Sequence, residues 1–201
     1  MRSAMRAYIR AIDGMNRAIG RVTMYLIFVL MGVLLWSSLS KATSTPSLWT
    51  LETAQFVMVA YYVLGGPYSI QLGSNVRMDL FYGDWSPRTK AIVDGFTVFF
   101  LLFYLVVLFM GAVSSTAYSL GYFGMEPFAF FGDLFMALIT DGIAGVQDKL
   151  GFLERSPTAW RPPLWPIKIV LCLGVFLMIL QALAEFFRDI EYLRGGDTDA
   201  A

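Results

Sequence analysis

The sequence contains no histidine and only one cysteine, Cys172. The missing histidines exclude a bis-histidine haem site, a histidine-ligated metal and a histidine-based catalytic triad within this chain. One cysteine excludes an intrachain disulfide, a thiolate metal cluster and a dithiol redox pair. Because no phosphate-binding loop or nucleophile elbow is recognisable either, we expect no cofactor and no enzymatic activity.

Charged residues are also scarce. They make up 15% of the 201 residues, whereas 57% are hydrophobic and the mean hydropathy is +0.62. Soluble domains have about 25% charged residues, so the composition indicates a lipid bilayer as the surroundings. The 15 basic residues balance the 15 acidic ones. Without a basic excess to meet phosphates, we expect no nucleic-acid partner.

Four stretches are long enough to cross about 30 Å of hydrocarbon and almost free of charge. They predict transmembrane helices over residues 22–40, 53–73, 95–115 and 165–184. The fourth stretch contains Lys168 near its start, and the stem of this side chain is expected to extend to the interface. The sequence therefore predicts an all-α integral membrane protein that forms a single membrane domain with four transmembrane helices.

The distribution of positive charge sets the orientation of these helices. Residues 1–21 contain five arginines and one acid, and the predicted loop 74–94 contains three basic residues. Both segments are expected in the cytoplasm, together with the C-terminal tail 185–201. The long loop 116–164 is then expected on the outer side of the membrane.

The first 21 residues have an amphipathic pattern. On a helical wheel the five arginines fall within an arc of about 100°, next to a sector of apolar residues. This pattern predicts a helix in the cytoplasmic interface, with its arginines near anionic headgroups. A cleaved signal peptide is the alternative for the first apolar stretch. That stretch is long, lacks a small-residue cleavage site and precedes three more spans, so we expect the helix to be retained.

The outer loop 116–164 is long for a connection between two spans. Its part 128–153 is apolar but contains Asp133, Asp141 and Asp148, which lie within about 80° of one another on a helical wheel. We expect a horizontal helix here, on the membrane surface or against a partner protein. The prolines after it predict an extended approach to the fourth span.

Ionisable residues inside a membrane are the usual sign of an ion or proton path. None lies at the middle of a predicted span, and Glu52 and Asp94 lie at span ends. The second span contains Gly65-Gly66-Pro67, which is expected to bend or locally break the helix. Because no second broken helix occupies a matching position, we interpret this motif as a packing feature rather than a transport site.

Four features together resemble the small membrane subunit of tripartite ATP-independent periplasmic (TRAP) transporters. They are the four spans with both ends inside, Trp49 followed by Glu52, the segment 75–79 (NVRMD) and the segment 156–168 (SPTAWRPPLWPIK). The third feature looks like the family's His-Val-Arg-Val-Asp type motif. Two departures are Asn75, which replaces the histidine, and the long outer loop.

The resemblance implies a place in the bacterial inner membrane and a division of labour among three proteins. A large membrane subunit with about a dozen transmembrane helices would hold the substrate and sodium sites and move during transport. A soluble periplasmic binding protein would deliver an organic acid, usually a carboxylate. The small subunit would be a static scaffold that stabilises the large subunit and helps to dock the binding protein. We expect the extra outer segment to enlarge one of these contacts.

The resemblance also supplies candidate residues for interfaces or for the fold, and none for substrate contact. One alternative function is that of a haem-free membrane anchor in a respiratory or other membrane enzyme complex. A self-sufficient exporter would require a membrane-embedded acid. The sequence offers only Glu52 for this role, and Glu52 lies at the end of a predicted helix. The candidate interface or structural residues are Trp49, Glu52, Arg77, Asp79, Trp160 and Trp165.

Overall fold

The computed structural model describes residues 2–43, 46–73 and 87–193, and these segments are helical apart from their connections. No sheet forms within them, where an isolated bridge joins Arg155 and Pro163. The predicted all-α fold is therefore confirmed for the described residues. The helices are α1 (Arg2–Met24), α2 (Leu26–Ala42), α3 (Thr50–Gln71), α5 (Pro87–Ser119), α6 (Pro127–Thr140), α7 (Gly142–Lys149) and α8 (Trp165–Leu193).

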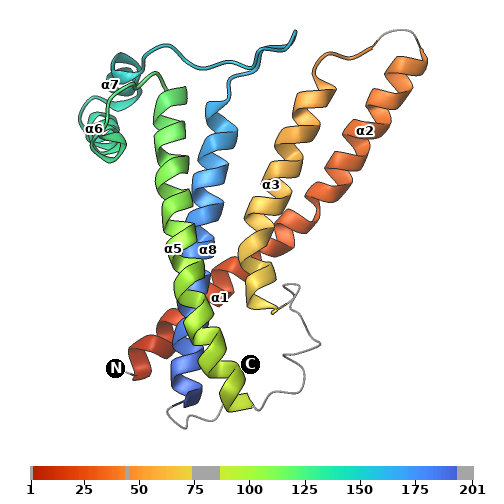
Figure 1. Ribbon diagram of the computed structural model, residues 1–201. Helices are drawn as coiled ribbons and strands as arrows, with labels where there is room; N and C mark the ends of the chain where they lie inside the picture. Colours follow the sequence, from red (N-terminus) through yellow and green to blue (C-terminus); the bar gives the residue numbers. More distant parts are fainter. Residues whose placement is uncertain (1, 44–45, 74–86, 194–201) are drawn as a thin grey trace.

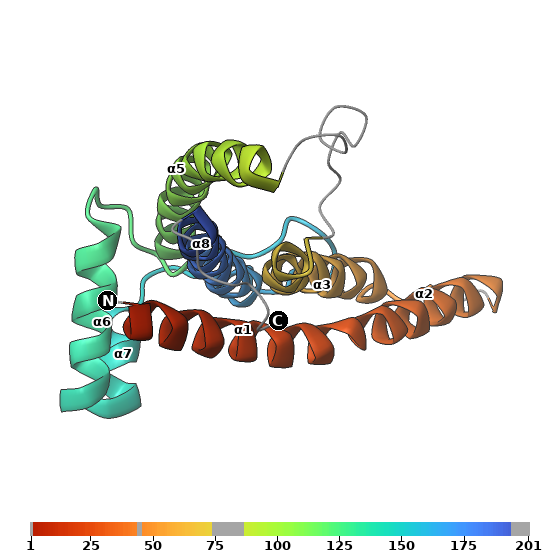
Figure 2. The ribbon, with the colours of Figure 1, turned by 90° about the horizontal axis from the view of Figure 1, so that it is seen from below.

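Four of these helices stand side by side in a single layer, in the order α2, α3, α8 and α5 (Figure 1). α8 packs against α3 on one side and against α5 on the other, while α2 packs against α3. Viewed along the helices, the row is open rather than closed into a bundle (Figure 2). We call the end of the row that carries residues 120–164 the loop end, and the opposite end, where α1 begins and α8 finishes, the terminal end.

The row buries only a thin core between neighbouring helices. Leu105 of α5 packs with Val175 and Ala182 of α8, and all three are buried. Many apolar side chains on the broad faces stay exposed, such as Leu35 of α2 and Phe103 of α5. An open layer with two apolar faces suits a chain that contacts lipid, partner helices or both.

α1 crosses one face of the row at the terminal end, over α3 and α8 (Figure 2). It continues into α2 with only a local interruption at Tyr25, whose N–H donates to the Val22 carbonyl at 3.1 Å. The sequence predicts the boundary between residues 21 and 22, whereas the structure has it at Tyr25. The interruption lies inside the apolar stretch, where hydropathy gives no signal for it.

Three helical stretches of the described residues have the length and hydropathy to cross a membrane. They are Ser3–Ala42, Gly95–Ser119 and Trp165–Glu191. α3 covers most of the predicted span 53–73 but falls below the same hydropathy, because it contains three tyrosines and polar residues such as Gln55. Its place as the fourth span stays a prediction.

Two helices extend beyond the predicted spans. α5 begins at Pro87 and ends at Ser119, and α8 continues to Leu193. The sequence predicts shorter helices because charge marks where an apolar stretch ends, not where the backbone leaves the helical conformation. The polar end of α8 joins this helix to α1, because its side chains bind α1 as described below.

Glycines let α3 and α8 approach closely. A Cβ atom added at Gly174 of α8 would lie 2.2 Å from Cγ1 of Val63 and 2.8 Å from its carbonyl oxygen. A Cβ atom at Gly66 of α3 would lie 3.1 Å from the sulfur of Met178. α3 runs without a break through Gly65-Gly66-Pro67. These contacts support the packing interpretation of that motif, since small residues permit close helix pairs.

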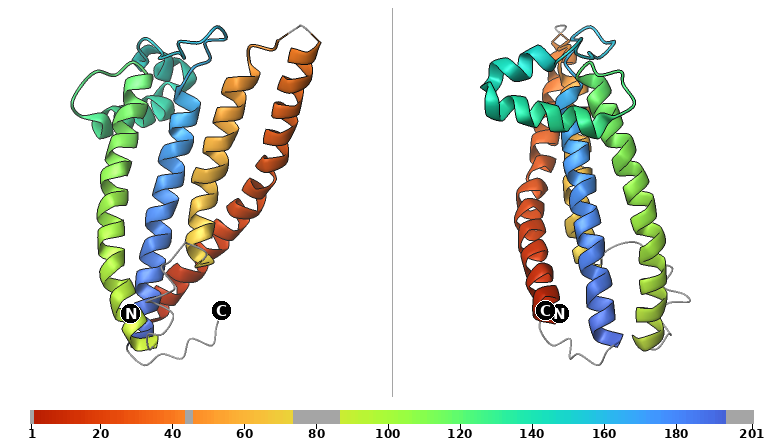
Figure 3. Two further views of the ribbon diagram at one scale, coloured as in Figure 1. Left: turned by 45° about the vertical axis from the view of Figure 1, so that its right-hand side comes forward. Right: turned by 90° about the vertical axis from the view of Figure 1, so that its left-hand side faces the viewer.

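The loop-end connection folds into α6 and α7, which lie beside each other across the end of α5 (Figure 3). The sequence predicts one helix through Asp133, Asp141 and Asp148. That prediction is wrong, because Gly142 adopts a positive φ of 66° and separates α6 from α7 directly after Asp141. The three acids therefore do not share the face of one helix.

A second small core fastens this connection to the row. Ala117 and Leu120 near the end of α5 are buried with Phe130 of α6. The Phe130 ring stacks on Tyr122 at a centroid distance of 4.6 Å. The chain returning from α7 is hydrogen-bonded to the same place, since the Gly151 N–H donates to the Leu120 carbonyl at 3.0 Å. We call this cluster the loop-end core.

Candidate functional site: polar clusters at the two ends of the row

Glu52 is the centre of a polar cluster at the loop end. It lies in the first turn of α3, where the helix dipole favours a carboxylate. Only 3% of the residue is exposed. Its Oε1 accepts hydrogen bonds from the hydroxyl of Ser156, at 2.5 Å, and from that of Thr158. Its Oε2 is buried and has no hydrogen-bond partner among the described residues.

The segment that reaches Glu52 is a short loop before α8. The Ser156 N–H donates to the Pro162 carbonyl at 2.9 Å, and Arg155 forms a bridge with Pro163, so the two sides of the loop are held together. Arg161 at its turn has a φ of 50°, in the left-handed region that few residues adopt. The predicted extended stretch is thus a closed loop fastened to the beginning of α3.

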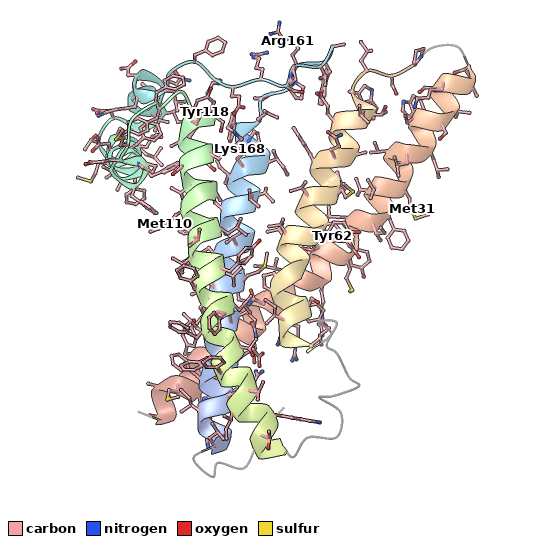
Figure 4. The ribbon with its side chains drawn as sticks, in the orientation of Figure 1. Met31, Tyr62, Met110, Tyr118, Arg161 and Lys168 are labelled. Carbon is pink, nitrogen blue, oxygen red and sulfur yellow. The ribbon has the colours of Figure 1, made fainter. Side chains whose placement is uncertain are left out.

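Lys168 forms a second polar contact at the loop end, between α8 and α5. Its Nζ lies 2.5 Å from a carboxylate oxygen of Glu154 and donates to the Ser115 carbonyl at 3.2 Å. It also lies 5.9 Å from the centre of the Tyr118 ring (Figure 4). The side chain therefore binds groups of this chain at the end of the row.

A larger polar cluster joins α1 to α8 at the terminal end. Gln181, whose exposure is 0%, accepts a hydrogen bond from the Asn16 amide at 2.7 Å and donates to Asp13 at 2.9 Å. Arg188 binds both oxygens of Glu185 and one of Asp13, each at 2.6 Å. Both carboxylates of the cluster bind the Arg188 guanidinium and the Gln181 amide, so the cluster joins the two helices through side chains of this chain.

Two further contacts strengthen the same junction. Arg6 of α1 lies 2.5 Å from Glu191 of α8. The Tyr8 hydroxyl donates to the Leu180 carbonyl at 3.1 Å, and its ring meets Phe187 edge to face. The predicted interfacial helix therefore packs against α8 and α3 over much of its length.

An apolar groove runs along α5 at the loop-end half of the row. Gly111 and Ser115 line it one helical turn apart, and the larger side chains of Tyr104 and Leu108 precede them on the same side of α5. Leu171 of α8 closes one side. A groove lined by small residues is a surface that admits another transmembrane helix.

The structure separates the residues that the sequence proposed. Glu52 is buried in the loop-end cluster, and Trp165 packs at the edge of the loop-end core. Trp49 precedes α3 and Trp160 lies in the loop before α8; both are more than a third exposed. The remaining two candidates, Arg77 and Asp79, lie outside the described residues.

Sequence reasoning missed the terminal-end cluster. Asp13 and Arg188 lie 175 positions apart, and no local pattern connects them. Two signals were available: Gln181 interrupts the apolar run of the fourth span, and Asp13 is the one acid among the arginines of residues 1–21. No group of three or more histidine, cysteine or acidic side chains that could hold a metal lies within the described parts of the chain.

Comparison with known proteins gives one match. The family described as "Tripartite ATP-independent periplasmic transporters, DctQ component" matches residues 30–131, just over half of the chain. No curated protein and no solved structure matches the sequence. The matched range includes α3 and α5 entirely, together with most of α2.

Proposed function

Because the chain belongs to the DctQ component family of tripartite ATP-independent periplasmic transporters, we propose that it is the scaffold subunit of a sodium-coupled transporter for an organic acid. The substrate and the sodium ions bind to the large subunit, and a periplasmic protein delivers the substrate. This chain widens and stabilises the large subunit and offers part of the docking surface.

The open helix row is the observation that carries this proposal. Both broad faces expose apolar side chains, and the polar side chains of the two end clusters bind other groups of the same chain. Helices in a membrane are stabilised by packing against neighbouring helices, so a layer of this kind gains stability from a partner on its broad faces. A static wall beside a larger protein gives the exposed faces partners and requires no ion path of its own.

The orientation follows from counting α3 as the fourth span. With four spans, both ends of the chain lie on one side of the membrane, and the arginines of residues 1–21 favour the cytoplasm. The terminal end is then cytoplasmic, in the bacterial inner membrane, and the loop end is periplasmic. In this arrangement Glu52 and the loop before α8 face the side from which the binding protein arrives.

The groove on α5 is our proposed contact with a helix of the large subunit. Gly111 and Ser115 allow a second backbone to approach, and the lining between Tyr104 and Leu171 supplies van der Waals contact. Replacing Gly111 by leucine fills part of the groove. The Cβ atom of the new side chain meets no other atom of the chain within 4 Å.

The experiment compares the full transporter with and without that change. Gly111→Leu should lower the amount of large subunit that co-purifies, while the amount of inserted small subunit stays constant. Gly32→Leu on α2 is the matched control, since its Cβ atom also meets nothing within 4 Å. Equal recovery of the large subunit with both variants would assign the interface to another face.

We assign the docking of the binding protein to the exposed residues of the loop end. Trp160 and Arg161 are exposed in the loop that Glu52 holds, and Trp49 is exposed directly before α3. Trp160→Ala combined with Arg161→Gly should reduce uptake in whole cells while the membrane complex still purifies intact. Unchanged uptake at limiting binding protein would refute this assignment. Arg77 and Asp79 stay proposed interface or structural residues of the cytoplasmic loop.

A further inference from the structure

α6 has a second apolar face that nothing in the described structure covers. On its first face, Phe130 is buried in the loop-end core, and Ala137 is buried as well. Because helical residues two positions apart point about 200° away from each other, Phe128 lies on the opposite side. The second face consists of Phe128, Phe135, Met136, Leu138 and Ile139, with exposures of 54%, 63%, 61%, 49% and 65%.

A ring contact fixes the direction of this face. Phe128 lies 6.5 Å from Phe109 of α5, measured between ring centres. Phe109 precedes the last residue of α5, Ser119, by ten positions, which corresponds to roughly 15 Å along the helix axis. α6 itself lies across α5 (Figure 3). The exposed face therefore points along α5 toward the middle of the row, not outward from the loop end.

The surface of α5 next to this face is also apolar and exposed. Met110 projects from α5 away from α8, on the side where α6 lies (Figure 4). Val106 and Phe103, four and seven positions before Met110 on the same side of α5, are exposed as well. The second face of α6 is thus continuous with the side of a helix that has the length and hydropathy of a membrane span.

Polar residues lie on the other sides of the helix pair. Asp133 of α6 and Asp141, which directly follows this helix, are exposed and do not belong to the second face. α7 lies beyond α6 at the loop end (Figure 1) and exposes Gln147, Asp148 and Lys149. Polarity therefore increases from α6 to α7 in the direction away from the row, as it does from acyl chains to water.

We propose that α6 is an interfacial helix whose second face is inserted in the bilayer, at the boundary of acyl chains and headgroups in the leaflet of the loop end. A helix of 14 residues is too short to span the membrane and long enough to lie in this boundary. Its inserted face carries no basic residue, so apolar burial and not attraction to anionic lipids holds it there. The anchored helix fixes the depth of the loop-end core and resists tilting of α5.

Site-directed spin labelling tests this placement in the full-length chain, reconstituted in phosphatidylcholine vesicles with any subunit that co-purifies. The background variant is Cys172→Ser, which keeps a hydroxyl where the thiol meets Thr116 at 3.2 Å. Labels at Phe135→Cys and Ile139→Cys probe the second face at two places. A label at Asp133→Cys on the same helix is the matched control.

Labels on the second face should collide with oxygen far more than with a water-soluble nickel chelate. Their depth should be about 5–10 Å below the headgroup boundary. The label at Asp133→Cys should show the reverse preference. Equal access to the nickel chelate at all three positions would overturn the proposal by placing α6 in water. Protection of the second face from both reagents would also overturn it, because a protein would then cover the face.

Discussion

Replacing Gln181 by leucine should detach α1 from α8. The Gln181 side chain is completely buried and makes hydrogen bonds to Asn16, Asp13 and Glu185 at 2.7, 2.9 and 3.2 Å. The two acids keep Arg188 as a partner when Gln181 is lost. Asn16 has no other side-chain partner among the described contacts, and its Oδ1 is already unpaired.

The expected cost follows from that difference. Asn16 is 1% exposed, so its amide would pay the desolvation penalty of an unsatisfied buried group, about 1–3 kcal/mol. Side-chain hydrogen bonds inside membrane proteins contribute roughly 0.6 kcal/mol on average, so the unpaired Asn16 amide supplies the larger part of the expected cost. We expect a loss of about 2 kcal/mol, equivalent to a roughly 30-fold shift toward detached α1.

Hydrogen–deuterium exchange of the reconstituted chain measures this shift directly. Peptides from α1 (Arg2–Met24) should exchange about 30-fold faster in Gln181→Leu, while peptides from α5 stay unchanged. Asn16→Leu alone should have a smaller effect, because Gln181 keeps both acids. The double variant should be less perturbed than Gln181→Leu, since two apolar partners leave no buried group unpaired. Additive effects of the two changes would refute the coupling between Asn16 and Gln181.

Three more changes test contacts elsewhere in the row. Gly174→Ala should lower the melting temperature of the chain in detergent, by the equivalent of about 1–3 kcal/mol, because the added Cβ atom would overlap Val63. The control Gly32→Ala should not lower it, since its Cβ atom meets nothing within 4 Å. Lys168→Met should destabilise the chain by about 1 kcal/mol, because the carboxylate of Glu154 loses its cation. The connection between α7 and α8 should then be cleaved faster by a protease, and unchanged cleavage would contradict this. Glu52→Ala should destabilise the loop before α8 by about 1–2 kcal/mol, seen as faster amide exchange there, because two hydroxyls lose their acceptor; unaltered exchange would exclude that role.

The elements of this protein were easier to predict than their arrangement. Long charge-free stretches identify α2, α5 and α8, because hydrocarbon tolerates few charges whatever the tertiary structure. The family resemblance is confirmed by the family match over residues 30–131, a range that includes Trp49, Glu52 and the segment 75–79 but not the segment 156–168 before α8. These signals are local in the sequence, so a single amino-acid sequence is sufficient to detect them.

The errors have a common physical origin in contacts and backbone conformations that hydropathy does not encode. Three acids at helical spacing suggested one surface helix, but the positive φ of Gly142 divides it. The junction of Asp13 with Arg188 depends on two helices from opposite ends of the chain meeting in space. The arrangement of the helices in a single layer could not be predicted either, because the sequence does not distinguish apolar side chains that face lipid from those that face protein.

Co-purification tests the scaffold assignment most directly. The chain is tagged in its native membrane, extracted in a mild detergent and recovered with whatever remains bound to it. The assignment predicts that a very hydrophobic partner of about a dozen spans is recovered with the chain. Recovery of the chain alone, or together with a redox enzyme, would contradict it.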